Sequence, residues 1–227
     1  MMIVGALIIL VRPINGIALL FPLLYLVDEK NRLSERLRWP RRFPLATACG
    51  SVAALLLWLP QLLYWRSITG ELFIFSYGRK GEHFEWSHPH LLDILLNVRN
   101  GWFIYTPIML PVIIALMCMA WKRIEGARTI LIIWSLAWMT YACWWSWWLG
   151  GAFGFRGFIE YYAFLAVPLA WIVQRVLEQR WPTRLSALLI CAALVIINIR
   201  MTVMFDWAWS SSEWTWTDLR GTWARIF

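Results

Sequence analysis

The sequence predicts an all-α integral membrane protein with about six transmembrane helices. Of its 227 residues, 61% are hydrophobic and 15% are charged, whereas soluble domains are about half apolar and a quarter charged. The apolar residues fall into runs of about 20, the length with which a helix crosses a bilayer. No series of alternating ten-residue segments, as in a membrane barrel, is present. The expected spans are 2–27, 44–65, 102–121, 129–148, 158–174 and 185–205.

These spans organise the chain into four parts. Two helices joined by a basic cytoplasmic loop make up 1–65, and 66–101 is an extracytoplasmic loop. Four helices fill 102–205, and 206–227 is an extracytoplasmic, tryptophan-rich tail. In the tail, we expect Ser212 to cap a helix that lies along the membrane interface. Aromatic residues step by four and three along the fourth span, which predicts one stripe on that helix: Trp134, Trp138, Tyr141, Trp145 and Trp148.

Charge predicts the orientation of the spans. The connections 28–42, 122–128 and 174–184 carry 12 Lys/Arg against 5 acidic residues, while the opposite side carries eight of each. Because positive loops stay in the cytoplasm, Met1 is expected on the outer side. From this outer start we infer that the chain is the C-terminal half of a longer membrane protein, or that the start of the gene has been assigned too late. The basic residues sit in short connections between spans, so the net charge of +8 indicates no nucleic-acid partner. The four cysteines lie in apolar stretches and indicate no disulfide framework.

Two arginines are candidate functional residues. Arg12 lies inside the first span beside Pro13. A charged side chain at this depth usually faces protein or a water-filled cavity, which would make Arg12 functional. Alternatively, the Arg12 side chain snorkels to the interface or pairs with a carbonyl that the proline leaves free. Arg156 follows a turn with four glycines in eight residues, 150–157, at the outer face. Its guanidinium suits phosphate oxygens, and the start of the next helix near Phe158 would add its dipole. The alternative is a structural pair with Glu160.

The outer loop carries His83, Glu85, His88 and His90. Their spacing matches no zinc pattern, so no metal site is predicted. Glu85 or a histidine is chemically suited to general acid or base work. The alternative is a loop that Phe84 and Trp86 fold over the third span. Tryptophans at the outer end of the fourth span, among them Trp148, would stack on a sugar or line an isoprenoid groove, or simply form an interfacial belt.

Four blocks of the sequence resemble one family. They are Leu10-Val11-Arg12-Pro13 with Asn15, Tyr77-Gly78 through Phe84-x-Trp86-x-x-Pro89, Arg99-Asn100-Gly101-Trp102-Phe103-Ile104-Tyr105-Thr106-Pro107, and Trp144-Trp145-x-Trp147-Trp148-x-Gly150-Gly151-x-Phe153-Gly154-x-Arg156. Together they resemble the C-terminal half of GT-C superfamily membrane glycosyltransferases, especially bacterial proteins similar to dolichyl-phosphate-mannose-protein mannosyltransferases. The third and fourth blocks are the specific ones.

The resemblance implies an enzyme of the bacterial inner membrane. It would move a sugar from a polyprenyl-phosphate donor to a lipid, glycan or protein acceptor on the outer face. Membrane lipids would surround it, and the resemblance implies no definite cofactor. The resemblance assigns Arg156 and Arg99 to the donor phosphate. The residues that it implies for the lining of the cavity are His88, Glu85, Trp148, Glu160 and Arg12. The family's catalytic acid belongs to a first outer loop upstream of this sequence.

Two other classes of function stay open. The first is half of a transporter or flippase, with Arg12 in a solute path and helices broken at Pro13, Pro107 and Pro111. The second is a non-catalytic subunit that scaffolds an envelope complex, in which Arg156 and Arg99 would be replaceable. The sequence does not show the internal repeat of spans that is typical of transporters.

Overall fold

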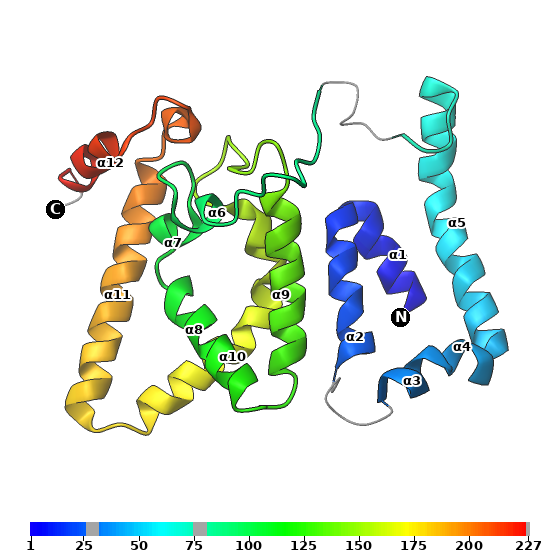
Figure 1. Ribbon diagram of the computed structural model, residues 1–227, viewed down its shortest axis with the longest axis horizontal. Helices are drawn as coiled ribbons and strands as arrows, with labels where there is room; N and C mark the ends of the chain where they lie inside the picture. The colour runs from blue at the N-terminus through cyan, green and yellow to red at the C-terminus, as the bar shows by residue number, and fades with distance from the viewer. Residues whose placement is uncertain (26–31, 75–80, 226–227) are drawn as a thin grey trace. The chain divides into compact units, whose positions relative to one another are not determined.

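The computed structural model describes residues 1–25, 32–74 and 81–225, and this part of the chain is built from helices (Figure 1). It divides into two compact units, Met1–His83 and Phe84–Phe227. Among the described residues, three helices are long and apolar enough to cross a membrane: Pro44–Thr69, Arg156–Leu177 and Trp181–Val203. The protein is therefore an all-helical membrane protein. Tyr77 and Gly78 of the second sequence block lie outside the described residues.

The expected first span is a helical hairpin. Helix α1 (Met2–Val11) ends at Arg12, and the chain continues as a 3-10 helix, η1 (Pro13–Leu19), and α2 (Leu20–Leu24). A Cβ built on Gly5 would lie 3.2 Å from Leu19, and one on Gly16 would lie 3.5 Å from Ile9. These pairings mean that the two arms run antiparallel, as Figure 1 shows. The prediction of one continuous helix over 2–27 is wrong.

Arg12 and Pro13 cause the reversal. Proline has no N–H to donate to the preceding turn, and its ring pushes the residue before it out of the helical region. Arg12 accordingly has φ −158° and ψ 110°. Arg12 thus lies at the tip of the hairpin rather than in the middle of a span.

The hairpin also removes the basis for placing Met1 outside. At about 1.5 Å per residue in an α-helix and about 2.0 Å in a 3-10 helix, the two arms measure about 15 and 21 Å, less than the hydrocarbon core of about 30 Å. The second arm returns to the end at which the first arm began. Met1 and Tyr25 therefore lie at the same end of the hairpin, whereas the orientation argument required 2–27 to cross once.

The rest of the first unit supports the hairpin. Helices α3 (Arg32–Leu37) and α4 (Trp39–Arg42) lead into α5 (Pro44–Thr69), which ends at the left-handed Gly70. Helix α5 is four residues longer than the expected span. Its Trp58 indole donates to the carbonyl of Ala6 over 3.2 Å, which attaches α1 along α5. Arg36 donates to the carbonyl of Leu23 over 3.0 Å and so caps the end of α2.

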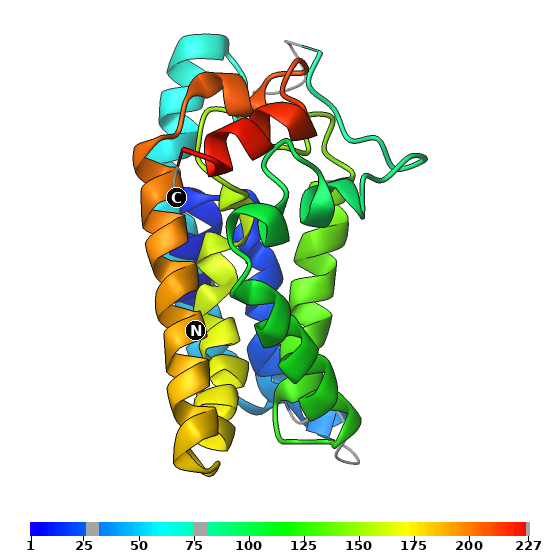
Figure 2. The ribbon, with the colours of Figure 1, turned by 90° about the vertical axis from the view of Figure 1, so that its left-hand side faces the viewer.

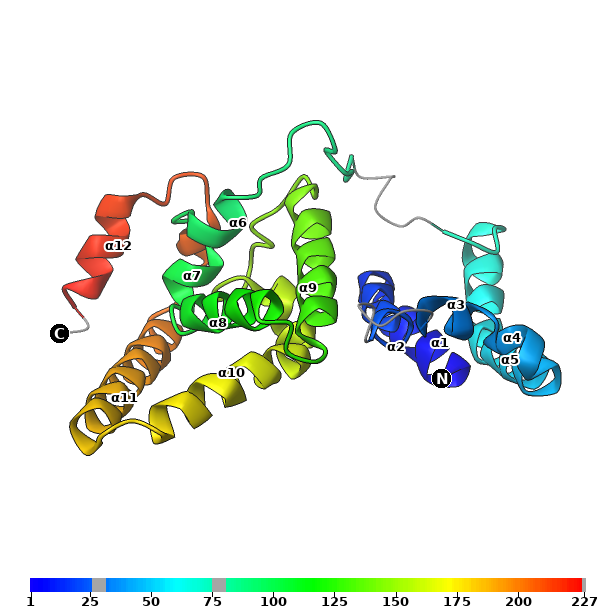
Figure 3. The ribbon, with the colours of Figure 1, turned by 60° about the horizontal axis from the view of Figure 1, so that its bottom comes forward.

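The second unit holds the remaining helices. They are α6 (Asp93–Leu96), α7 (Trp102–Tyr105), α8 (Met109–Trp121), α9 (Ala127–Ala142), η3 (Arg156–Tyr161), α10 (Tyr162–Leu177), α11 (Trp181–Val203), η4 (Trp207–Ser210) and α12 (Trp216–Trp223). Helix α8 packs against both α9 and α10 (Figure 3). The basic turns after α8 and α10 lie at one end of this unit. The outer loop, the glycine-rich turn and the tail lie at the other end (Figures 1 and 2).

Two expected spans of this unit are shorter than predicted. The range 102–121 is divided into α7 and α8, with Pro107 in the break. Helix α9 stops at Ala142, because the outer loop takes its terminal carbonyls: the His90 N–H donates to Ala142 over 2.8 Å, and the Glu85 N–H donates to Cys143. The aromatic stripe therefore holds for Trp134, Trp138 and Tyr141, and fails for Trp145 and Trp148, which lie beyond the helix.

The tail forms a helix with a different cap from the one expected. Thr215, not Ser212, precedes α12 and forms a capping box with Asp218. The Thr215 hydroxyl accepts from the Asp218 N–H over 3.4 Å, and the Asp218 carboxylate accepts from the Thr215 N–H over 2.9 Å. Reciprocal bonds of this kind satisfy two N–H groups that the helix itself leaves unpaired.

Candidate functional site

The two most specific sequence blocks meet in space. The Asn100 amide donates to the carbonyl of Trp148 over 3.1 Å. Asn100 and Leu149 both adopt positive φ, 58° and 44°, a conformation that asparagine tolerates better than most residues. Trp102 packs edge-on against Phe158, with ring centroids 4.6 Å apart. The loop before α7 and the turn before η3 therefore form one structural unit, which we call the outer turn pair (97–106 and 143–158).

Arg99 lies on the tryptophans of the outer turn pair. Its guanidinium carbon is 3.9 Å from the centroid of the Trp148 ring and 6.0 Å from that of Trp147. A cation over an indole face is stabilised by about 0.5 to 2 kcal/mol, depending on how far it is desolvated. Partial burial lowers the pKa of Arg99, but an arginine stays charged at neutral pH. The site thus holds a fixed cation at the end of the second unit that carries the tail and the glycine-rich turn.

Arg156 starts η3 on the other side of the same turn. A Cβ on the next residue, Gly157, would lie 3.0 Å from the side chain of Leu149, which follows Trp148. The Arg156 side chain is exposed, and so is that of Glu160. The backbones that carry Arg99 and Arg156 thus flank one turn, 147–149.

The helical start near Arg156 differs from the one expected. The helix was expected to begin near Phe158, but η3 begins at Arg156 and the regular α-helix at Tyr162. Gly154, with φ 65°, lies against Tyr105: an added Cβ would approach the Tyr105 Cβ to 3.3 Å. Glycine here permits both the left-handed backbone and this close approach.

The outer loop folds onto the end of α9, not over the third span as expected. Phe84 and Trp144 form an isolated antiparallel bridge, and their rings lie 4.9 Å apart. Phe84 also stacks on Trp86 at 5.3 Å. The Trp138 indole donates to the carbonyl of Leu91 over 2.9 Å. These contacts fix the segment from Phe84 to Leu91 beside the tryptophans of the outer turn pair.

The predicted loop residues have different surroundings. Glu85 approaches His90, with 3.9 Å between Oε2 and Nε2. His88 is exposed, and its Nδ1 lies 2.9 Å from the hydroxyl of the adjacent Ser87. His83 belongs to the first unit. Among residues 1–25, 32–74 and 81–225, no group of three or more His, Cys, Asp or Glu side chains has the arrangement of a metal site.

Sequence reasoning did not single out Asp93 and Asn97, which complete this region. The His90 Nδ1 lies 3.0 Å from the Asp93 carboxylate, and the Asn97 amide donates to the other Asp93 oxygen over 2.9 Å. His90, Asp93 and Asn97 recur at intervals of three and four, which places them on one face of a helical segment. The spacing of these three residues could therefore have been recognised in the sequence.

Arg12 belongs to the first unit, at the tip of the hairpin, and is partly buried. It is the one member of the predicted cavity lining that is not part of the second unit. The contacts described above connect Arg99, Trp148, Glu85 and the turn that carries Arg156, and they do not involve His88.

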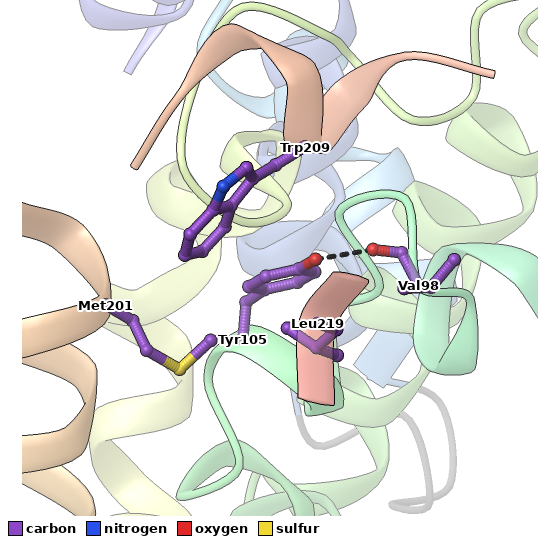
Figure 4. Packing of buried hydrophobic residues seen from close by; sticks show 5 residues of the cluster. All are labelled: Val98, Tyr105, Met201, Trp209 and Leu219. Carbon is purple, nitrogen blue, oxygen red and sulfur yellow. Dashed lines mark hydrogen bonds between the residues drawn. The ribbon is translucent and has the colours of Figure 1, made fainter. Parts of the chain in front are cut away.

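The tail holds the outer turn pair in place. Tyr105, Trp209, Met201, Leu219 and Val98 form a buried cluster in which the ring of Tyr105 is central (Figure 4). The Tyr105 hydroxyl donates to the Val98 carbonyl over 2.5 Å. The rings of Tyr105 and Phe153 lie edge to face at 5.5 Å, so the tail, the loop before Arg99 and the glycine-rich turn share one core.

No protein-family model, curated protein or solved structure matches this chain.

Proposed function

We propose that this chain is the C-terminal part of a polytopic membrane glycosyltransferase. It moves a sugar from a polyprenyl-phosphate donor to a lipid, glycan or protein acceptor on the outer face of a bacterial inner membrane. The observation that carries the proposal is the placement of Arg99 on Trp148, beside the turn from which Arg156 projects.

This arrangement suits a phosphate-linked sugar. As the bond between the sugar and the phosphate breaks, negative charge builds up on the phosphate oxygens. A guanidinium that is already positioned stabilises that charge without reorganisation. Its planar donors also match two phosphate oxygens at once.

Donor binding and transfer test the proposal. The protein is reconstituted in lipid nanodiscs with labelled polyprenyl-phosphomannose, and binding and loss of the sugar are followed. We expect Arg99→Ala and Arg156→Ala each to weaken donor binding by about tenfold or more, the loss that follows removal of one charge-assisted contact. Arg180→Ala serves as the matched control, because Arg180 is an exposed arginine at the opposite end of the same unit. Retained binding and transfer in both site variants would contradict the proposal.

The hairpin favours a second candidate, half of a transporter or flippase. Short helices that meet at a break are typical of transporter binding sites, and α1 and η1 meet at Arg12 and Pro13. The break at Pro107 also exists, whereas Pro111 lies inside α8. Transport of a lipid-linked sugar or a small anion across proteoliposomes, abolished by Arg12→Ala and retained in Arg99→Ala, would favour this candidate over the transferase.

A further inference from the structure

A groove runs between α1 and α5 in the first unit, with a volume of about 650 Å³. Small-molecule sites occupy about 300 to 1,000 Å³. Apart from Ser51, the described residues that line the groove are glycine or carry apolar or aromatic side chains. They include Gly5, Ala6 and Ile9 of α1 and Ala54, Leu55 and Trp58 of α5. The Trp58 indole N–H is bonded to the Ala6 carbonyl, so its ring adds only apolar surface. The groove therefore suits a hydrocarbon ligand.

The dimensions of the groove fit a single hydrocarbon chain. From Ser51 to Leu62 its α5 wall is about 17 Å long at about 1.5 Å per residue, close to the depth of one leaflet, about 15 Å. A helix of this length and about 10 Å across would occupy about 1,300 Å³, about twice the volume of the groove. The two walls approach closely at one end, where a Cβ on Gly50 would lie 2.8 Å from the Met2 sulfur. An acyl chain fits this space, whereas a further helix does not.

Three arginines lie on one face of the helical segment that precedes α5. The N–H groups of Arg41 and Arg42 both donate to the carbonyl of Arg38 over 3.0 Å, so the three residues share one helical turn at intervals of three and four. Their side chains are exposed. From position 33 to 43, the segment carries four arginines and one acidic residue, Glu35. A basic cluster of this kind beside a membrane-spanning helix attracts anionic lipid headgroups.

Aromatic side chains place the same segment at the membrane surface. Trp39 is 43% exposed and Phe43 is 54% exposed, and the Arg42 guanidinium lies 5.6 Å from the centroid of the Phe43 ring. Tryptophan at such a position is typical of headgroup depth. Helix α5 begins at Pro44, two residues after Arg42, and the groove begins at Ser51, about 10 Å further along the helix (Figure 1). The arginines thus lie at the headgroup end of an apolar groove.

We propose that an anionic glycerophospholipid binds to the first unit. Its phosphate lies at Arg38, Arg41 and Arg42, and one acyl chain lies in the groove between α1 and α5. This inference does not rest on the proposed function. The guanidinium donors match phosphate oxygens, and each methylene buried in the groove strengthens binding about fourfold. The lipid completes the packing of the hairpin, whose arms are too short to cross the hydrocarbon core.

Lipid titration of the full chain tests the headgroup site. The protein is purified in a neutral detergent, phosphatidylglycerol or phosphatidylcholine with the same acyl chains is added, and bound lipid is counted by native mass spectrometry. We expect phosphatidylglycerol to bind about tenfold or more tightly than phosphatidylcholine. Arg41→Gln/Arg42→Gln should weaken phosphatidylglycerol binding by about tenfold or more, since each arginine near an anionic headgroup contributes about fivefold. Arg123→Gln/Arg180→Gln replaces two exposed arginines of the second unit and should bind as the wild type does.

Two variants of α5 test the groove separately. Ala54→Phe places a ring in the groove and should weaken phosphatidylglycerol binding by about tenfold or more, because the acyl chain loses at least about two buried methylenes. Ala48→Phe is the matched control, since Ala48 is exposed on the same helix outside this lining. Circular dichroism verifies the helix content of each variant. The arginine variants change exposed side chains, so they decide the proposal even where Ala54→Phe does not fold.

Three outcomes overturn the proposal. Equal affinity of the wild type for the two phospholipids, or a loss in Arg41→Gln/Arg42→Gln no greater than in its control, removes the headgroup site. Equal binding by folded Ala54→Phe and Ala48→Phe removes the acyl chain from the groove. Polyprenyl phosphate that displaces phosphatidylglycerol about tenfold more strongly than phosphatidylglycerol itself would make the groove a site for the carrier lipid. None of these measurements involves sugar transfer, so their failure and that of the proposed function are distinguishable.

Discussion

The indole of Trp214 donates a hydrogen bond to the hydroxyl of Tyr105 over 3.1 Å, across 109 positions of the sequence. The same hydroxyl donates to the carbonyl of Val98. Tyr105 is fully buried, at 0% exposure. One phenol oxygen therefore satisfies a donor from the tail and an acceptor from the loop that leads to Arg99.

We expect Tyr105→Phe to destabilise the protein and loosen its tail. The substitution keeps the ring but leaves the Trp214 N–H and the Val98 carbonyl without this partner, which costs about 1 to 3 kcal/mol for each buried group. Thermal unfolding in nanodiscs and proteolysis of the tail measure the effect. Tyr64→Phe is the control, because Tyr64 is exposed on α5. Equal unfolding temperatures for the two variants would show that the hydrogen bonds of Tyr105 do not hold the tail.

The glycine between α6 and α7 makes a second test. A Cβ on Gly101 would lie 2.3 Å from the Asn97 carbonyl oxygen and 2.7 Å from its nitrogen, and backbone atoms cannot yield as a side chain does. Gly101→Ala should therefore separate α6 from α7, with a loss of several kcal/mol of the kind that overpacking causes. Its effect should include displacement of Arg99, seen as weaker binding of polyprenyl-phosphomannose.

Gly221→Ala is the counterpart. A Cβ on Gly221 meets nothing within 4 Å, and the residue lies inside α12. Alanine should stabilise the helix by about 0.5 to 1 kcal/mol through lower conformational freedom of the unfolded chain. The change in the free energy of unfolding should have opposite signs for Gly101→Ala and Gly221→Ala, and one unfolding assay measures both. If both variants destabilise equally, glycine content rather than the close approach at Gly101 explains the loss.

Acid should release the tail helix. The side-chain and backbone hydrogen bonds from Thr215 hold the pKa of Asp218 below its ordinary value. A carboxyl whose pKa is lower in the folded state contributes stability above its unfolded pKa of about 4 and loses it as the pH falls through the folded value. The protection of the amides of 216–223 against hydrogen exchange, measured relative to the intrinsic exchange rate at each pH, should therefore fall below about pH 4. Asp218→Asn should remove this pH dependence, whereas Glu213→Gln, an exposed control, should preserve it.

The sequence predicted the helical membrane class and the start of α5, and it placed the other ends of α5 and α11 within four residues, because uninterrupted apolar runs leave few alternatives. It did not predict the reversal at Arg12, since an apolar run of 26 residues has the same composition as one long helix or as a hairpin. The signal was local: an arginine before a proline, where a helix usually ends. The pattern Thr215-x-x-Asp218 could likewise have been recognised in the sequence as a capping box. Thr215, rather than Ser212, is the residue that caps α12.

The site was only partly predictable. The two sequence blocks contain Arg99 and Arg156, and their backbones approach the same turn, 147–149, where the Asn100 amide donates to Trp148 and Gly157 lies close to Leu149. The stacking of Arg99 on Trp148 depends on where α9 ends. The sequence did not show that end, because Trp145 and Trp148 continue the helical spacing of aromatic residues beyond it. The pairing of His90 with Asp93 follows a helical interval, but its approach to Trp147 is a long-range contact that no interval in the sequence shows.

Trp148 provides the last test of the donor site. If its indole positions the Arg99 guanidinium, Trp148→Ala should weaken polyprenyl-phosphomannose binding by about three- to thirtyfold, which corresponds to about 0.5 to 2 kcal/mol of cation–π stabilisation. Trp148→Phe keeps an aromatic face and should retain most of the affinity. Arg99→Lys keeps the charge but loses the planar donors, and should fall between wild type and Arg99→Ala.

Trp145 supplies the matched control, since its ring packs edge-on against Trp148 at 6.2 Å and is 37% exposed. Trp145→Ala should alter donor affinity much less than Trp148→Ala, because the Arg99 guanidinium lies over the Trp148 ring at 3.9 Å and near the Trp147 ring at 6.0 Å. The double variant Trp148→Ala/Arg99→Ala should bind no worse than Arg99→Ala alone, as expected when one residue acts through the other. Additive losses would mean that Trp148 contacts the donor independently of the arginine, which would make its ring a binding surface rather than a support.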